Sequence, residues 1–334
     1  MIYFLGIVLL ILPVLSVYTE YRVTRIEADL PADGQFVVAD GVPIHFHRLK
    51  PDRDLSGQPS LVFIHGASGN AYDQLEAFRG ALAGRYDLIF VDRPGLGHSG
   101  RSSDAQSGPS GQARLIGKAL DAMGVTQAVV LGHSLGASVT AALALERPDL
   151  VDGLVFIAPA THPWPGGVTW YYNVASLPVI GRIFCATLTL PIAERVAPAA
   201  ILGVFAPEEA PADYDEMIRL PLLFRPDSFR ANAMDVAGLK EHVAQLSQRY
   251  SEIGVPAVVI TGDKDTIVWP SIHSDGLVRD LPQARLVTLP GAGHMPHHTR
   301  TQDVVREIEW VMDRAWAPKS ALPQPQTAEM LADK

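Results

Sequence analysis

Short apolar runs alternate with amphipathic stretches along most of this chain. The apolar runs are typical of strands buried on both faces of a parallel sheet, and they occupy residues 61–65, 88–91, 128–131, 154–157, 257–261 and 284–289. Between most of them apolar side chains recur near helical spacing, over residues 73–83, 112–123 and 137–146. Ser110 and Pro148 are suitable start and stop signals for such helices.

Two β-rich segments precede these runs, at residues 35–39 and 42–49. They are separated by Asp40-Gly41, a dipeptide that tolerates the positive φ angles of a tight hairpin turn. The whole pattern predicts an α/β fold with an eight-stranded, mostly parallel sheet flanked by helices.

The alternation fails once, after Ala160 and as far as about Leu239. An insertion of roughly 75 residues is too long for an ordinary loop, and this one is rich in proline and in large apolar side chains. We therefore predict a mostly helical cap, or lid, over residues 161–239. The α/β core would then comprise residues 35–160 and 240–316, and the polar, proline-containing segment 317–334 is predicted to be a disordered tail.

The first nineteen residues contain no charged side chain. A helix of that length nearly spans a hydrocarbon core of about 30 Å, so residues 1–19 are predicted to be an N-terminal transmembrane anchor. The alternative is a cleavable signal peptide, which would leave a secreted or periplasmic protein, but the segment lacks a basic start and a small-residue cleavage site. Arg22 and Arg25 follow the segment and no basic residue precedes it. The positive-inside rule therefore places the body on the cytoplasmic side.

Composition and charge narrow the class of protein. The chain has 334 residues, 48% of them hydrophobic, which is enough for a large core and excludes intrinsic disorder. Acidic residues outnumber basic ones by 36 to 27, giving a net charge of −9, so nucleic acid is not expected as a partner. The single cysteine, Cys185, excludes an internal disulfide framework and a cysteine-rich metal site. A formal G-x-G-x-x-G string at 95–100 is not followed by a helix start, so no dinucleotide cofactor is expected.

The first chemical motif is Gly-His-Ser-Leu-Gly at residues 132–136, placed between a predicted strand and a predicted helix. A nucleophile on such a sharp turn needs small neighbours, and Gly132 and Gly136 supply them. The turn also directs the N-terminus of the helix at the reacting centre, where its free N–H groups favour a developing oxyanion. Ser134 is therefore the candidate nucleophile.

A serine hydroxyl needs a base to take its proton, and the base needs an acid to orient it. Two later loops supply candidates, each directly after a predicted strand: 262–270, which contains Asp263 and Asp265, and 290–296, which contains His294. Loops at the carboxyl ends of parallel strands meet at one edge of the sheet, so these groups can converge with Ser134.

With these motifs the sequence resembles the α/β-hydrolase fold superfamily over about residues 35–316. The matching elements are His65-Gly66, the segment 92–99, the turn at Ser134, the G-x-x-D loop ending in Asp265, and Gly293-His294. The resemblance implies Ser134 as nucleophile, Asp265 as orienting acid and His294 as general base. It also implies an oxyanion hole made by the backbone N–H groups of Ala67 and Leu135.

Alternatives remain for two of these assignments. Asp263 could be the acid in place of Asp265, although the family pattern selects Asp265 and makes Asp263 a turn residue. His297 and His298 follow His294 closely, but no Asp, Glu or Cys has a convincing ligand spacing with them, so no metal is expected. His65 and His133 are expected to be packing or hydrogen-bonding residues near the site.

The predicted activity is hydrolysis of a carboxylic ester through an acyl-enzyme, since relatives that act on halides or epoxides carry Asp at the turn. The apolar insertion and the anchor suggest a small-molecule, hydrophobic ester-like substrate, such as a medium-chain or lipid-derived ester. C–C bond hydrolases, thioesterases, amidases and cofactor-free haloperoxidases of the same fold remain alternatives. A non-catalytic, membrane-tethered binding protein is an alternative of another class.

Overall fold

In the computed structural model, which describes residues 2–55 and 57–316, the described chain forms one eight-stranded sheet in the order β1-β2-β4-β3-β5-β6-β7-β8. β1 pairs antiparallel with β2 and β2 antiparallel with β4, while all other pairs are parallel. The predicted sheet is confirmed. Its strands are β1 (Gln35–Ala39), β2 (Val42–Leu49), β3 (Ser60–Ile64), β4 (Leu88–Val91), β5 (Ala128–His133), β6 (Val151–Ile157), β7 (Ala257–Gly262) and β8 (Ala284–Leu289).

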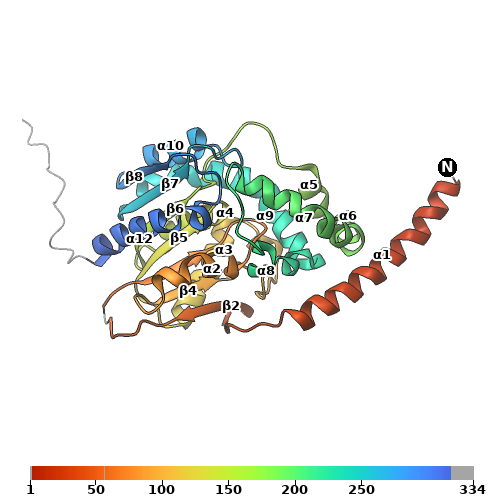
Figure 1. The fold of residues 1–334 in the computed structure, drawn as a ribbon, viewed down its shortest axis with the longest axis horizontal. Coiled ribbons are helices and arrows are strands. Elements are labelled where there is room, and N and C mark those ends of the chain that lie inside the picture. The colour runs from red at the N-terminus through yellow and green to blue at the C-terminus, as the bar shows by residue number, and fades with distance from the viewer. Residues whose placement is uncertain (1, 56, 317–334) are drawn as a thin grey trace, which may run out of the picture.

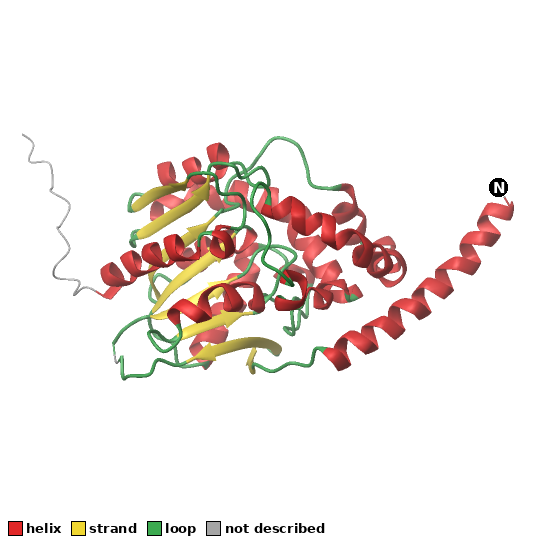
Figure 2. Cartoon of the chain, in the orientation of Figure 1, coloured by secondary structure: helices red, strands yellow, loops and turns green. Residues whose placement is uncertain are grey.

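Helices cover both faces of this sheet (Figure 2). On β3, Val62 and Ile64 pack on the side of one set of helices, whereas Leu61 and Phe63 pack on the other. Both faces are therefore apolar, which explains why the strands are continuous apolar runs. The first set is α3 (Pro109–Ala122), α4 (Leu135–Glu146) and α10 (Pro270–Asp280), and the second is α2 (Ala71–Leu82) and α12 (Thr301–Trp316).

Two helix starts differ from the prediction. α3 begins at Pro109, and Gly108, not Ser110, is its N-cap residue. Proline fits the first turn of a helix, where its missing N–H is not needed. α2 begins at Ala71 because the Asn70 side chain accepts a hydrogen bond from the Tyr72 N–H.

The insertion between β6 and β7 contains helices and lies beyond the carboxyl ends of the central strands (Figure 1). Its last helix, α9, runs from Pro226 to Leu246 and so crosses the predicted cap boundary at 239. The end of α9 packs on the main core through Leu239, Val243 and Leu246. The other elements are α5 (Trp170–Ser176), α6 (Ile180–Phe184), a π-helical turn η2 (Cys185–Thr189), α7 (Leu190–Phe205), α8 (Tyr214–Met217) and the 3₁₀ turn η3 (Leu220–Phe224).

The chain before the sheet forms one helix, α1 (Ile2–Asp29), which projects from the body (Figure 1). Among residues whose side chains the structure describes, a single helical run is long and apolar enough to cross a membrane, Ile180–Phe205 in the cap. The predicted anchor over residues 1–19 is not that run, and the side chains of residues 2–10 lie outside the description. The anchor stays a prediction. The predicted disordered tail, 317–334, also lies outside the described residues.

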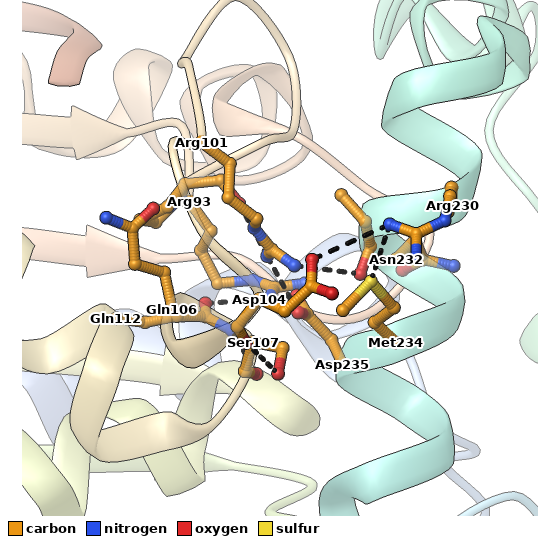
Figure 3. A network of polar contacts seen from close by, with 12 residues as sticks. Arg93, Arg101, Asp104, Gln106, Ser107, Gln112, Arg230, Asn232, Met234 and Asp235 are labelled. Carbon is orange, nitrogen blue, oxygen red and sulfur yellow. Dashed lines mark hydrogen bonds and ion pairs between the residues drawn. The ribbon is translucent and has the colours of Figure 1, made fainter. Parts of the chain in front are cut away.

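A buried ion network joins the cap to the core (Figure 3). Arg93, fully buried after β4, donates to the Asp235 Oδ2 of α9 at 2.7 Å and to the Gln112 Oε1 of α3 at 2.9 Å. Arg101 donates to the other Asp235 oxygen, also at 2.7 Å. The Arg93 guanidinium further donates to the backbone carbonyls of His65 and Gly66, each at 3.0 Å. The Arg93 guanidinium thus links α9 of the cap to the loop after β3.

We predict that Asp235→Ala lowers the free energy of unfolding by about 3–5 kcal/mol, because it leaves a buried guanidinium without its counter-charge. Chemical denaturation followed by circular dichroism measures this loss. Asp149→Ala is the control, because that carboxylate is exposed and pairs with Arg147 at the surface, so the free energy of unfolding of this variant should barely change. Equal free energies of unfolding for the two variants would contradict the structural importance of the network.

Candidate active site

Ser134 lies on a strained turn between β5 and α4. Its backbone has φ 51° and ψ −119°, a region that non-glycine residues rarely adopt and that costs on the order of 1–3 kcal/mol. The strain is imposed by close packing on either side. A Cβ on Gly136 would lie 2.2 Å from the Ile64 carbonyl oxygen, and one on Gly132 would lie 2.4 Å from the Thr140 Oγ1. Both glycines are therefore required for the turn to form.

Asp265 and His294 meet at the neighbouring strand ends. The His294 Nδ1 lies 2.8 Å from the Asp265 Oδ2, and both side chains are buried. The other carboxylate oxygen accepts from the backbone N–H groups of Ile267 and Val268, each at 2.9 Å. A carboxylate accepts only, so the imidazole proton is on Nδ1 and the Nε2 lone pair is available.

Asp263 does not take part in this pair. Its Oδ1 accepts from the Gly291 N–H at 2.7 Å, which ties the loop after β7 to the loop after β8. The structure therefore brings Asp265, and not Asp263, to His294.

Ser134 and His294 line the same pocket, which has a volume of about 280 Å³. Gly66 and Ala67, from the loop after β3, line it as well, and Leu135 forms the first turn of α4 beside Ser134. The N–H groups in the first turn of a helix have no partner within that helix, so they can donate hydrogen bonds to an anion. The rest of the wall is largely apolar and comes from the cap, including Tyr172, Ile192, Val196, Ile201, Leu223 and Phe229.

The cap also contacts the loop that carries Ala67. Ser68, at φ 58°, donates its backbone N–H to the Asn232 Oδ1 of α9 at 2.7 Å. The Asn232 Nδ2 donates to the Ser68 Oγ at 3.1 Å, and the same hydroxyl lies 3.3 Å from the Tyr172 hydroxyl of α5. The cap thus holds the residue next to one candidate oxyanion donor.

Two histidines beside the site are hydrogen-bonding residues, as the sequence suggests. His133 lies with its Nε2 3.0 Å from the His294 carbonyl oxygen, so this nitrogen donates and positions the His294 loop. Burial holds the pKa of His133 well below its ordinary value. His65 accepts from the Arg93 N–H at 3.0 Å, and burial together with the Arg93 charge lowers its pKa to about 3. Both rings are therefore neutral at pH 7.

One buried group was not predicted from the sequence: Asp73 of α2 lies between His297 and His298. The Asp73 oxygens lie 3.1 Å and 2.8 Å from the two Nε2 atoms, and Tyr214 donates to Asp73 at 2.9 Å. Burial acts to raise the pKa of Asp73, but the two imidazoles hold it well below its usual range. One possible metal-ligand atom from each of these three residues lies within 4.8 Å of the other two, and divalent transition metals bind such a set of imidazole nitrogens and a carboxylate oxygen. Here the side chains hydrogen-bond to one another. Sequence spacing could not reveal a partner so distant in the chain.

The fold and the serine turn define an α/β protein of the hydrolase type, with its candidate groups at the carboxyl edge of the sheet. The model of the Alpha/beta hydrolase family matches residues 61–307, and the chain belongs to this family.

Relatives with curated names are similar over most of the chain. The sn-1-specific diacylglycerol lipase ABHD11 of Mus musculus is 28% identical over 275 residues, covering 80% of this chain and 84% of the relative. A 2-hydroxy-6-oxononadienedioate/2-hydroxy-6-oxononatrienedioate hydrolase of Burkholderia vietnamiensis is 29% identical, covering 77% and 87%. Among solved structures, the esterase RhEst1 from Rhodococcus sp. ECU1013 superposes with a TM-score of 0.65 at 20% identity, covering 84% of this chain and 99% of that one. That last likeness shows the shared fold.

His273, on α10 after the Asp265 loop, gives a pH prediction. Its Nδ1 accepts the backbone N–H groups of Thr161 at 3.2 Å and His162 at 3.1 Å, and burial lowers its pKa to about 4. The unfolded chain therefore binds a proton below about pH 6.5 that the folded chain refuses down to about pH 4. This contribution to stability is complete above pH 6.5 and is lost as the pH falls, by at most about 1.4 kcal/mol per pH unit.

We expect His273→Asn to make the fall in unfolding free energy between pH 6.5 and pH 4 shallower, since the amide oxygen can accept the same N–H groups without titrating. Urea denaturation across this range measures the slope. His242→Asn, at an exposed position, should keep the wild-type slope. A wild-type slope in His273→Asn would show that His273 is not the titrating group.

Proposed function

We propose that this protein is a serine hydrolase that cleaves a carboxylic ester of a hydrophobic substrate through an acyl-enzyme intermediate. The observation that carries the proposal is the 2.8 Å Asp265–His294 contact beside a strained Ser134 in one pocket. A pocket wall made mainly of apolar cap residues supports the hydrophobic substrate.

In the proposed mechanism the His294 Nε2 takes the Ser134 hydroxyl proton as the oxygen attacks the ester carbonyl. The resulting oxyanion accepts hydrogen bonds from the backbone N–H groups of Ala67 and Leu135. His294 then gives its proton to the leaving alcohol, and the acyl-enzyme forms. A water that is deprotonated by the same imidazole releases the acid, while Asp265 holds the ring and stabilises its charged form.

The alternative activities given in the sequence analysis differ in the bond that is cleaved, and we keep them as alternatives. The same serine nucleophile could act on thioesters, amides or C–C bonds, and a cofactor-free haloperoxidase would use the same pocket. We further propose that residues 1–19 anchor the protein in a membrane, with the hydrolase body on the cytoplasmic side. The support is the uncharged segment and the arginines that follow it.

Removing the nucleophile gives the direct test. We expect Ser134→Ala to abolish hydrolysis of p-nitrophenyl esters and labelling by a fluorophosphonate probe, because no oxygen is left to attack. Ser110→Ala, on α3, should keep both. A panel of acetyl to palmitoyl esters, thioesters and amides then identifies the bond and the acyl length. Wild-type ester turnover in Ser134→Ala would overturn the proposal, and wild-type protein that folds but is never labelled would favour the non-catalytic binding protein.

The two neighbouring aspartates offer a matched pair. Asp265→Asn should lower kcat by roughly 10³–10⁴-fold, because an amide can hold the wrong imidazole tautomer and cannot stabilise the positive ring. Asp263→Asn should change kcat only a few-fold, since its carboxylate binds a backbone N–H instead. Steady-state kinetics on one soluble ester compares them. Equal losses would contradict the assignment of Asp265 as the orienting acid.

A further inference from the structure

The cap exposes large apolar side chains on or beside the helices α5, α6 and α7. We call Trp170, Val179, Ile180, Ile183, Ile192 and Val196 the cap face. Each is about half or more exposed, with Val179 at 69% and Trp170 at 66%. Only 17% of the most apolar part of the Ile180–Phe205 run is buried, so this is not the core helix of a soluble domain. Apolar exposure on this scale marks a surface that meets another apolar phase.

The cap face is continuous with the entrance of the candidate active site. Trp170, Ile192 and Val196 are exposed and also line the pocket that holds Ser134 and His294. Apolar side chains at the rim make no hydrogen bonds to a hydrated substrate. They can contact hydrocarbon, so an apolar substrate remains in an apolar environment as it enters the pocket. The rim therefore favours substrates that arrive from an apolar phase.

α1 leads away from the same part of the molecule (Figure 1). Its second half is fixed to α7, where the Arg22 Nη2 donates to the Glu194 Oε1 at 2.6 Å and the Tyr18 hydroxyl donates to the Glu194 Oε2 at 3.0 Å. Ile26 is buried with cap residues, including Leu190 and Ala193. α1 also contacts η2. The uncharged N-terminal segment is thus joined to the cap at its C-terminal end.

Charge distinguishes a bilayer from other apolar partners. From residue 170 to 205 the charged residues are Arg182, Glu194 and Arg195, and Glu194 is neutralised by Arg22. Both arginines are exposed, and no ion pair found in residues 2–55 and 57–316 involves either. The segment 170–205 therefore carries a net charge of +1, and Arg22 balances its one carboxylate, on a chain whose net charge is −9; such a segment suits anionic headgroups. This segment is amphipathic, carries exposed arginines and also lines a pocket. These properties are typical of a segment that lies on a membrane surface, not of one that crosses the membrane.

We propose that the cap face docks on an anionic lipid bilayer, with the pocket entrance facing the lipid, so that the protein takes a hydrophobic ester directly from the membrane. The substrate part of this inference rests on the proposed hydrolase function. α1 holds the cap at the surface, and the exposed isoleucines and Trp170 enter the interface.

Fluorescence tests the docking on the full-length chain in phosphatidylcholine–phosphatidylglycerol vesicles. Val179→Cys and the matched control Val38→Cys, on β1 and 65% exposed, are labelled with an environment-sensitive dye; the native Cys185 is buried. We expect doxyl-labelled lipids to quench the dye at residue 179 and not at residue 38. Equal, weak quenching at both positions would overturn the proposal. A blue shift at residue 179 without lipid quenching would do the same, because it would show that another protein copy covers the face.

Kinetics tests its consequence with a variant outside the pocket. Ile180→Asp/Ile183→Asp should hydrolyse a long-chain ester in vesicles about tenfold more slowly, a loss that corresponds to about 1.4 kcal/mol. Hydrolysis of a soluble short-chain ester should stay at the wild-type rate, which also shows that the variant folds. Val38→Asp should match wild type on both substrates. Wild-type rates on both esters for Ile180→Asp/Ile183→Asp would overturn docking and leave the hydrolase intact, whereas wild-type protein inactive on every ester would refute the proposed function itself.

Discussion

The close approach of two backbone segments at Gly136 is the constraint on which this site depends. The start of α4 lies so close to the end of β3 that a Cβ at Gly136 would overlap the Ile64 carbonyl oxygen. This contact fixes where α4 leaves the sheet, and Ser134 adopts a positive φ to make the turn. The strain is held by a core that is buried on both faces of the sheet, so the hydroxyl position is set by packing and not by a flexible loop. The neighbouring strands β7 and β8 then need only short loops to bring Asp265 and His294 to the same edge.

Charge is handled by pairing around this edge. Arg93 is fully buried, yet Asp235, Gln112 and two carbonyl groups satisfy its guanidinium. Asp73 is surrounded by two imidazoles and a phenol in the same way. His65 and His133 are kept neutral by burial, so they orient their neighbours through hydrogen bonds without adding charge beside His294. The surroundings of the site are thus preorganised: Arg93 and Asp73 already have fixed partners before a substrate arrives.

The sequence predicts the parallel part of the sheet well because both of its faces are buried, and each strand from β3 to β7 therefore contains a continuous apolar run. Ser134 and His294 could be proposed because each follows a recognisable strand and because strand order decides which loops meet. Asp263 and Asp265 follow the same strand, so only the family pattern favoured Asp265. Asp73 could not be proposed, since its two histidine partners lie more than two hundred positions away and spacing carries no information about such a contact. The end of the cap was also hidden, because α9 changes its packing partner from cap to core along one uninterrupted helix. The sequence pattern indicates local periodicity only, whereas the Asp73 group and the end of the cap depend on which surfaces pack together in the folded chain.

The link between Asn232 and Ser68 has a consequence for how molecules enter and leave. Asn232 belongs to α9 and holds the backbone N–H and hydroxyl of Ser68, the residue next to Ala67. If the cap opened as a rigid body, α9 would move away from this loop and the Asn232–Ser68 hydrogen bonds would break during turnover. If instead the cap stays closed and substrate enters through a fixed portal, these bonds are kept, and the width of the opening between side chains would limit the rate of entry and release. Residues at that portal, and not a hinge, would then be the natural target for re-engineering which molecules pass.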